Sequence, residues 1–164
     1  AGLFILIEDQ YSIGDVIRIG DVAGSVEMIN LRRTVLRDLD GVQHHIPNGE
    51  IKLASNLTKD WSKINIQVPV SYDTDIDKVT ALLNQIGKEL ADSAEHKDSF
   101  IEPPTVLGLD KFGPSELLLK VVAKTRPGMQ WEMARELRKR IKMTFDTEGI
   151  EIPFPQRVVH QINK

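Results

Sequence analysis

The sequence of 164 residues contains no cysteine, which excludes disulfides, thiolate nucleophiles and cysteine metal sites. The lack of thiols is what a protein of a reducing compartment commonly shows. A basic excess is also missing, since 21 lysines and arginines stand against 24 aspartates and glutamates and the formal net charge is −3. A protein that binds nucleic acid through the phosphate backbone needs clustered basic charge, so this balance argues against that class.

The chain has no apolar run of the length that a membrane-spanning helix requires, which is about 20 residues. The apolar stretch Ala1–Ile7 stops at Glu8-Asp9, and no basic segment precedes it that would indicate a signal peptide. Two interpretations of this stretch remain open, a buried first strand or the cut end of a longer apolar helix. The second interpretation predicts that the chain is the water-facing part of a membrane protein.

Motifs for catalysis, cofactors and metals are missing as well. There is no P-loop, no G-x-G-x-x-G after a strand and no G-x-S-x-G elbow. Asp73–Asp77 (DTDID) has the spacing that opens a calcium loop, but Lys78 and Asn84 stand where that loop needs glycine and glutamate, so we expect a helix cap instead. His44 and His45 would point to opposite faces of one strand. We predict no catalytic residue, no cofactor, no metal site and no enzyme activity.

The first third of the sequence predicts a small β unit. Asp40-Gly41 lies between two apolar patterns and predicts a hairpin with a type I′ turn. Pro47-Asn48-Gly49 ends the run, because proline cannot donate to a central ladder. Short strands of this kind build small, strongly bent barrels. The expected strands are Val16–Ile19, Ser25–Ile29, Thr34–Leu39 and Val42–Ile46.

The remainder, after the polar stretch Thr58–Lys63, alternates strand and helix patterns. Its order β-α-β-β-α-β predicts a ferredoxin-like layer, and the fold class is therefore α+β. The expected strands are Ile64–Val70, Val106–Leu109, Leu117–Ala123 and Ile150–Ile152, and the expected helices are Asp75–Asp92 and Gln130–Thr147.

Local signals set the predicted ends of these elements. Asp73 or Thr74 is expected to cap the first helix, and Gly149 to end the second. Pro103-Pro104 is expected to break the chain before the second strand of this part. Trp131 belongs to the apolar stripe that we expect the second helix to bury.

Several short motifs, taken in order, resemble the small-conductance mechanosensitive (MscS-like) channel family. Each motif alone is weak, but their order and spacing extend over essentially the whole chain. Val70–Asp77 (VSYDTDID) resembles the start of the family's second cytosolic domain, and Ile152–Gln156 (IPFPQ) resembles its C-terminal close. In the β unit the family's marks are Gly14-Asp15, Gly24-Ser25-Val26, Arg32 with Thr34, Asp40-Gly41 and Ile46-Pro47-Asn48-Gly49.

The resemblance implies a division of the chain and a set of functional residues. The implied parts are the end of the pore-lining transmembrane helix (1–7), an Sm-like β domain (8–58), an inter-domain linker (59–63), a ferredoxin-like α/β domain (64–152) and a strand for an oligomeric parallel β-barrel (153–164). The implied residues are Gly2, Leu3 and Phe4 at the end and hinge of the pore helix, Lys59, Asp60, Ser62 and Lys63 as possible portal lining, and Phe154, Val158, His160 and Ile162 in the barrel.

The function implied by the resemblance is that of the cytosolic vestibule of a tension-gated channel in the cell inner membrane. The channel would be a homoheptamer that releases ions and small osmolytes on hypoosmotic shock, held in the membrane by helices ahead of Ala1, with no nucleic-acid partner. Two other classes stay open, an Sm-like RNA-binding module and a purely structural ring-forming module. Arg32-Arg33 is the compact basic pair of the β unit and has acidic neighbours, which gives the RNA-binding class little support.

Overall fold

The computed structural model describes residues 8–162. Contacts divide the chain into two compact units that meet between Ser62 and Lys63, and we call them the β unit and the α/β unit. Each is described by itself below. No helix among residues 8–162 is both long enough and apolar enough to cross a membrane.

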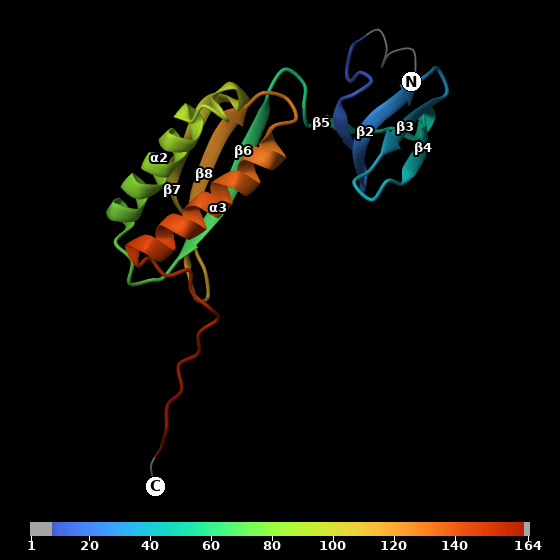
Figure 1. Cartoon of the computed structure of the whole chain (residues 1–164). Helices are drawn as coiled ribbons and strands as arrows, with labels where there is room; N and C mark the ends of the chain where they lie inside the picture. The colour runs from blue at the N-terminus through green and yellow to red at the C-terminus, as the bar shows by residue number, and fades with distance from the viewer. Residues whose placement is uncertain (1–7, 163–164) are drawn as a thin grey trace. The chain divides into compact units, whose positions relative to one another are not determined.

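The β unit is a five-stranded antiparallel sheet in the order β4-β3-β2-β1-β5 (Figure 1). Its core contains Tyr11, Ile17, Val26 and Leu36, all nearly inaccessible to solvent. The predicted all-β character is confirmed, whereas the fifth strand was not predicted. The strands are β1 (Val16–Ile19), β2 (Val22–Ile29), β3 (Arg33–Arg37), β4 (Gln43–Pro47) and β5 (Ala54–Asn56), and the 3-10 turn η1 (Asn48–Glu50) lies between β4 and β5.

The turn between β3 and β4 differs from the predicted type I′ turn. Gly41 has a φ of +79°, but Asp40 is not among the non-glycine residues with positive φ, and a type I′ turn requires positive φ at both central positions. The carboxylate of Asp38 instead accepts hydrogen bonds from the amides of Asp40 and Val42, both at 2.9 Å. The side chain of Asp38 thus organises a longer loop, residues 38–42, and the predicted turn type is wrong.

The α/β unit has a three-stranded sheet in the order β6-β8-β7, with β8 in the middle (Figure 1). Burial alternates along β8, so one face of the sheet is buried, and α2 and α3 cover that face. The elements are β6 (Ser62–Val70), α2 (Ile76–Asp92), the 3-10 turn η2 (Lys97–Ser99), β7 (Phe100–Phe112), β8 (Leu117–Thr125) and α3 (Gln130–Glu148).

Two features of this sheet correct the sequence prediction. Ile150–Ile152 carries no strand, and the amide of Ser71 donates to the carbonyl of Glu151 at 3.3 Å without a ladder forming. Pro103-Pro104 lies inside β7, where the register with β8 shifts between Glu102 and Thr105. An edge strand tolerates proline at such an irregularity, because no inward donor is required there.

The helices agree with the prediction in extent but differ at individual positions. The N-cap of α2 is Asp75, not Asp73 or Thr74, and its carboxylate accepts from the amides of Asp77 (3.0 Å) and Lys78 (3.1 Å). In α3, Trp131 is 40% exposed, so its predicted burial is wrong. Gly149 ends α3 in the left-handed conformation with φ of +69°, as its position predicted.

Candidate functional site

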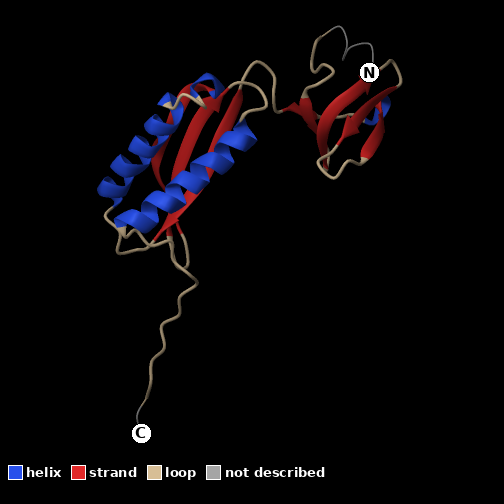
Figure 2. Cartoon of the chain, in the orientation of Figure 1, coloured by secondary structure: helices blue, strands red, loops and turns tan. Residues whose placement is uncertain are grey.

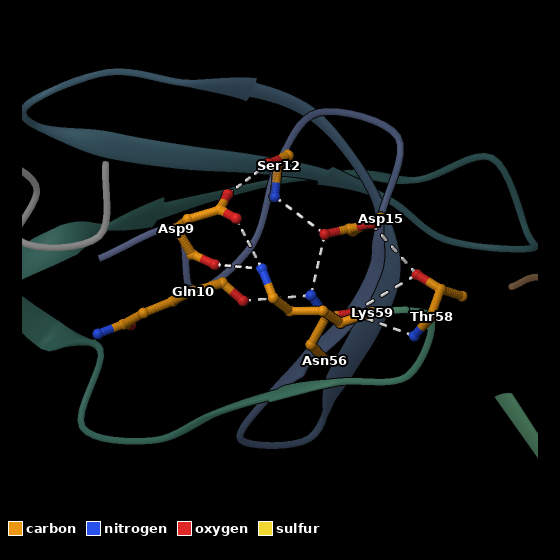
Figure 3. Close-up of polar contacts among 7 residues, drawn as sticks. All are labelled: Asp9, Gln10, Ser12, Asp15, Asn56, Thr58 and Lys59. Carbon is orange, nitrogen blue, oxygen red and sulfur yellow. Dashed lines mark hydrogen bonds and ion pairs between the residues drawn. The ribbon is translucent and has the colours of Figure 1, made fainter. Parts of the chain in front are cut away.

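The residues before β1 and those after β5 lie side by side, because these two strands pair antiparallel with Ile17 opposite Asn56. The pairing continues one step further, since the amide of Leu57 donates to the carbonyl of Val16 at 2.9 Å. Polar side chains from both segments meet there (Figure 3). We call this cluster the polar junction, and it consists of Asp9, Gln10, Ser12, Asp15, Asn56, Thr58 and Lys59.

An ion pair between Asp9 and Lys59 forms one end of the polar junction. The ammonium of Lys59 lies 2.8 Å from the carboxylate of Asp9 and 2.6 Å from its backbone carbonyl. The hydrogen bond from Lys59, with a second from Ser12 at 3.1 Å, lowers the pKa of Asp9, and the same contact raises the pKa of Lys59. Both side chains are partly exposed, so water and salt screen the pair.

The carboxylate of Asp15 lies at the other end of the polar junction. It accepts from the amide of Ser12 at 3.0 Å and from the side-chain amide of Asn56 at 2.9 Å. The Asn56 amide also donates to the carbonyl of Gln10 at 3.2 Å, and the hydroxyl of Thr58 accepts from the amide of Val16 at 3.0 Å. Residues 10–16 are therefore tied to residues 56–58 by several hydrogen bonds, in addition to the strand pairing.

The backbone is constrained at both ends of this connection. Asp9 has a φ of +48° and Asp60 a φ of +64°, in the left-handed region that few non-glycine residues adopt. Aspartate tolerates this region better than most residues. The chain therefore turns sharply at Asp9, which is a member of the ion pair, and at Asp60, which follows Lys59.

A second, buried network fixes Tyr11 next to the polar junction. The Tyr11 hydroxyl lies 2.9 Å from the hydroxyl of Thr34, which in turn donates to the side-chain oxygen of Asn48 at 2.9 Å. The Asn48 side chain donates to the carbonyl of Asn30 at 2.7 Å. These bonds satisfy polar groups that are costly to bury alone, and they give the Arg32-x-Thr34 and Pro47-Asn48-Gly49 motifs a structural role.

The polar junction holds its two chain segments together through hydrogen bonds and one ion pair. The carboxylates of Asp9 and Asp15 are taken up by hydrogen-bond donors of the protein itself. Within residues 8–162 there is no group of three or more histidine or acidic side chains that could hold a metal ion. The His44 ring nitrogen lies 2.8 Å from the carboxylate of Asp38, in the β3–β4 loop. The site joins the segment before β1 to the segment after β5.

Of the residues predicted for the pore helix and the portals, only the portal residues lie in the described part of the chain. Gly2, Leu3 and Phe4 lie outside the described residues. Lys59 is part of the polar junction, and Asp60 and Lys63 are exposed. Ser62 is buried, and its hydroxyl donates to the carbonyl of Leu57 at 3.0 Å.

The residues predicted for the oligomeric barrel all lie in a segment without helix or strand, residues 150–162 (Figure 2). The amide of Gln156 donates to the hydroxyl of Ser115 at 3.0 Å near the start of that segment. Phe154, Val158 and Ile162 are more than 80% exposed, and His160 is exposed too. Several exposed apolar side chains in one segment mark a protein–protein contact more often than a single one does.

No role was predicted from the sequence for Asp9 or Asn56, and Asp15 appeared only within the Gly14-Asp15 motif. Asp9 is 50 positions from Lys59, and no local pattern links them. A fifth strand at residues 54–56, paired with the strand that contains Ile17, would have placed Asn56 opposite Ile17.

Comparison with known proteins identifies the family. A family model described as the β-domain of mechanosensitive ion channels matches residues 1–59, and one described as the C-terminal part of the mechanosensitive ion channel MscS matches residues 64–152. The chain belongs to the MscS family of mechanosensitive channels. Within this family it is 42% identical to a small-conductance mechanosensitive channel of Caldanaerobacter subterraneus, over 97% of this chain and 55% of the relative.

Other members of the MscS family agree with this assignment. The channel MscMJ of Methanocaldococcus jannaschii is 30% identical over 98% of this chain and 46% of the relative. Among solved structures, the closed state of Helicobacter pylori MscS has a TM-score of 0.75 and 26% identity, and the match covers 99% of this chain and 64% of that one. The chain thus spans about half the length of the curated relatives it matches.

Replacing Thr34 by valine is expected to destabilise the β unit by about 1–3 kcal/mol, because Tyr11 and Asn48 lose their buried hydrogen-bond partner. Amide hydrogen exchange of β2 and β3, measured on the whole chain, checks this effect. Thr34→Ser retains the hydroxyl and serves as the matched control. Equal exchange rates in Thr34→Val and the unaltered chain would show that the network contributes nothing.

The Asp9–Lys59 ion pair predicts a pH dependence of defined sign. The pKa of Asp9 is lowered in the folded chain, so its contribution to stability is present above the unfolded value of about 3.9 and is lost as the pH falls through the lowered folded value. We expect the carboxyl carbon of Asp9, followed by NMR, to titrate at higher pH in Lys59→Met than in the unaltered chain. Lys63→Met is the control and should leave this titration unchanged.

Proposed function

We propose that this chain is the cytosolic vestibule of a tension-gated channel that releases ions and small solutes on hypoosmotic shock. The observation that carries the proposal is the order of the two family matches, which follow one another over residues 1–59 and 64–152. The relatives named small-conductance mechanosensitive channel support the same activity. The helices that gate and conduct would belong to a part of the protein ahead of these residues, in the inner membrane.

Within that channel, the polar junction would transmit force into the β unit. A pore helix that ends near residue 7 would pull first on Asp9, and Lys59 and Asn56 would resist through their contacts with Asp9, Gln10 and Asp15. The β unit would then respond as one body, because the tied segments flank β1 and β5. Gly2 would supply the bend of that helix, with Leu3 and Phe4 beside it.

The proposed assembly is a homo-oligomeric ring, a heptamer by resemblance to the family. Phe154, Val158, His160 and Ile162 would form one strand per subunit of a parallel barrel. Their exposure supports this role, since pairing in a barrel would cover side chains that now lie open. The prolines Pro153 and Pro155 would delay pairing until after residue 155, because each removes a backbone donor.

The lateral openings of the vestibule would be lined by charges on the linker. Asp60 and Lys63 are exposed and suit this role. Lys59 suits it less, because its charge is compensated by Asp9, and the buried Ser62 donates to its own unit. The net effect of the linker on passing ions would therefore depend mainly on Asp60 and Lys63.

A chimera tests the proposed function. The corresponding region of the Caldanaerobacter channel is replaced by this chain, the chimera is expressed in cells that lack their own mechanosensitive channels, and membrane patches are stretched. We expect a tension-activated conductance and survival of hypoosmotic shock. A chimera that is present in the membrane at normal levels but passes no current under tension would contradict the proposal.

In the same chimera, charge reversal at the linker is expected to shift ion selectivity. Asp60→Lys should favour anions and Lys63→Glu should favour cations, because a charge at a narrow opening attracts ions of opposite sign. The shifts in reversal potential should be larger at low salt, since the screening length is about 8 Å at 0.15 M. Reversal at exposed Glu89 on α2 is the control. Unchanged selectivity at both linker positions would exclude them from the lining.

A further inference from the structure

We infer that neighbouring copies of this chain contact each other through Leu39 of one β unit, which inserts into a pocket of the next β unit lined by Ile19, Val22, Ile46 and Leu53. This inference rests on the self-assembly part of the proposed function and names the surfaces involved. Both surfaces belong to the β unit.

The first surface is a leucine that the fold holds fully exposed. Leu39 stands on the β3–β4 loop with a relative exposure of 107%, the highest among the large exposed hydrophobic side chains of the described residues. Its neighbours Asp38 and Asp40 are both acidic. An isolated exposed leucine is ordinary. Two further features support a contact at Leu39, namely the bonds that hold its loop and a pocket that could accept its side chain.

The loop that carries Leu39 is closed by several hydrogen bonds. In its backbone, the amide of Asp38 donates to the carbonyl of Val42 at 3.0 Å, and the amide of Gly41 donates to the carbonyl of Asp38 at 3.1 Å. The Asp38 carboxylate adds its two bonds to backbone amides and a contact of 2.8 Å with His44. Contacts with His44 and the amides of Val42 and Asp40 lower the pKa of Asp38, so this carboxylate stays charged in neutral solution.

Arg37, the last residue of β3, links the same loop to β2. Its guanidinium donates to the carbonyl of Gly41 at 3.0 Å and makes a two-point contact with the carboxylate of Glu27 on β2, at 2.8 and 3.1 Å. Gly24 of β2 lies so close to the carbonyl of Arg37 that a Cβ there would collide with it. The backbone of a loop held in this way has less freedom to lose on binding than an unrestrained loop, which favours association.

The second surface is a pocket of about 460 Å³ between the β1–β2 turn, β4 and the segment before β5. Ile19, Val22 and Ile46 are half-buried in its wall, and Leu53 is 74% exposed beside it. An apolar side chain that entered this pocket would cover the exposed leucine and complete the apolar lining.

Charge on the two surfaces is complementary. Arg18 and Lys52 stand at the pocket, and Glu50 is the acidic residue among its lining, so the pocket carries one net positive charge. The leucine that would enter is flanked by Asp38 and Asp40. Opposite charges around an apolar contact favour this orientation and disfavour contacts between two acidic loops or two basic pockets.

The contact joins two different surfaces and is therefore heterologous. Such contacts generate closed rings when the rotation between copies closes, whereas a self-complementary patch stops at a dimer. A projecting leucine on one side and a pocket on another is the arrangement that a ring requires. An anionic amphiphile, with an apolar tail and a negative head group, is the other occupant that the pocket chemistry fits, and the experiment below distinguishes the two.

The absence of cysteine makes a direct test possible, because every disulfide formed must join introduced residues. We expect Leu39→Cys/Leu53→Cys, oxidised in the whole chain, to give a ladder of covalent oligomers beyond the dimer. The matched control is Leu39→Cys/Leu31→Cys, since Leu31 is also exposed (65%) and also lies in a turn of the β unit. The control should give clearly less product.

Charge variants test the orientation of the contact without cysteine. Asp40→Lys and Lys52→Glu should each weaken self-association, measured by sedimentation, and Asp40→Lys/Lys52→Glu should restore it. Leu39→Ser should raise the dissociation constant about tenfold or more, because it removes the apolar contact. None of these exposed positions belongs to the core, and circular dichroism verifies that each variant is folded.

Four outcomes would overturn the inference. These are crosslinking no greater than in the control pair, a disulfide confined to one copy, a chain that stays monomeric at all concentrations, and binding to anionic vesicles that Lys52→Glu abolishes while self-association is unchanged. The last outcome would assign the pocket to a lipid head group and tail. The stretch-activated current of the chimera is measured independently, so the failure of this contact and the failure of the proposed channel function are distinguishable.

Discussion

The antiparallel pairing of β1 with β5 is the constraint on which the polar junction depends. Strand β5 has three residues, and its register places Asn56 opposite Ile17. A shift of one residue would turn every side chain of β5 to the other face of the sheet. Asn56 would then lose both Gln10 and Asp15, and the residues that follow it would move away from Asp9. The side-chain bonds to Asp15 and from Thr58 to the amide of Val16 act against such a shift, so the short strand and the junction stabilise each other.

Three sets of polar contacts in the β unit differ in burial and therefore in their contribution to stability. The Asp9–Lys59 pair is open to water, and exposed ion pairs contribute little to stability. The bond between Asn56 and Asp15 is partly buried, and Tyr11, Thr34 and Asn48 of the inner network are almost fully buried. A pull on the chain before residue 9 would therefore break the outer pair first and leave the inner network intact. In the proposed channel, the connection to the pore helix would therefore lengthen slightly under force before the β unit itself deformed.

Much of the fold could be predicted from the sequence, because most of its signals are local. The extent of α2 and the glycine after α3 depend on neighbouring residues, and both predictions agree with the structure. The errors occurred where a distant partner decides the outcome. Pro103-Pro104 sits in β7 because β7 is an edge strand, and Ile150–Ile152 has the composition of a strand but no ladder to join. The turn at residues 38–42 was misjudged because the side chain of Asp38, outside the predicted two-residue turn, replaces the backbone bonds of a type I′ turn.

The residues proposed for the linker openings show the same limit, because a distant residue decides the charge of one of them. From the sequence, two positive charges, Lys59 and Lys63, and one negative charge, Asp60, stand on a polar linker with nothing to distinguish their surroundings. In the structure the charge of Lys59 is compensated by Asp9, which lies 50 positions earlier in the chain. The field at the linker is then set by one exposed acid and one exposed base, Asp60 and Lys63, rather than by an excess of positive charge. Composition alone thus overstates the basic character of this segment, and the sign of any selectivity must follow from the positions of Asp60 and Lys63 relative to the path of the ions.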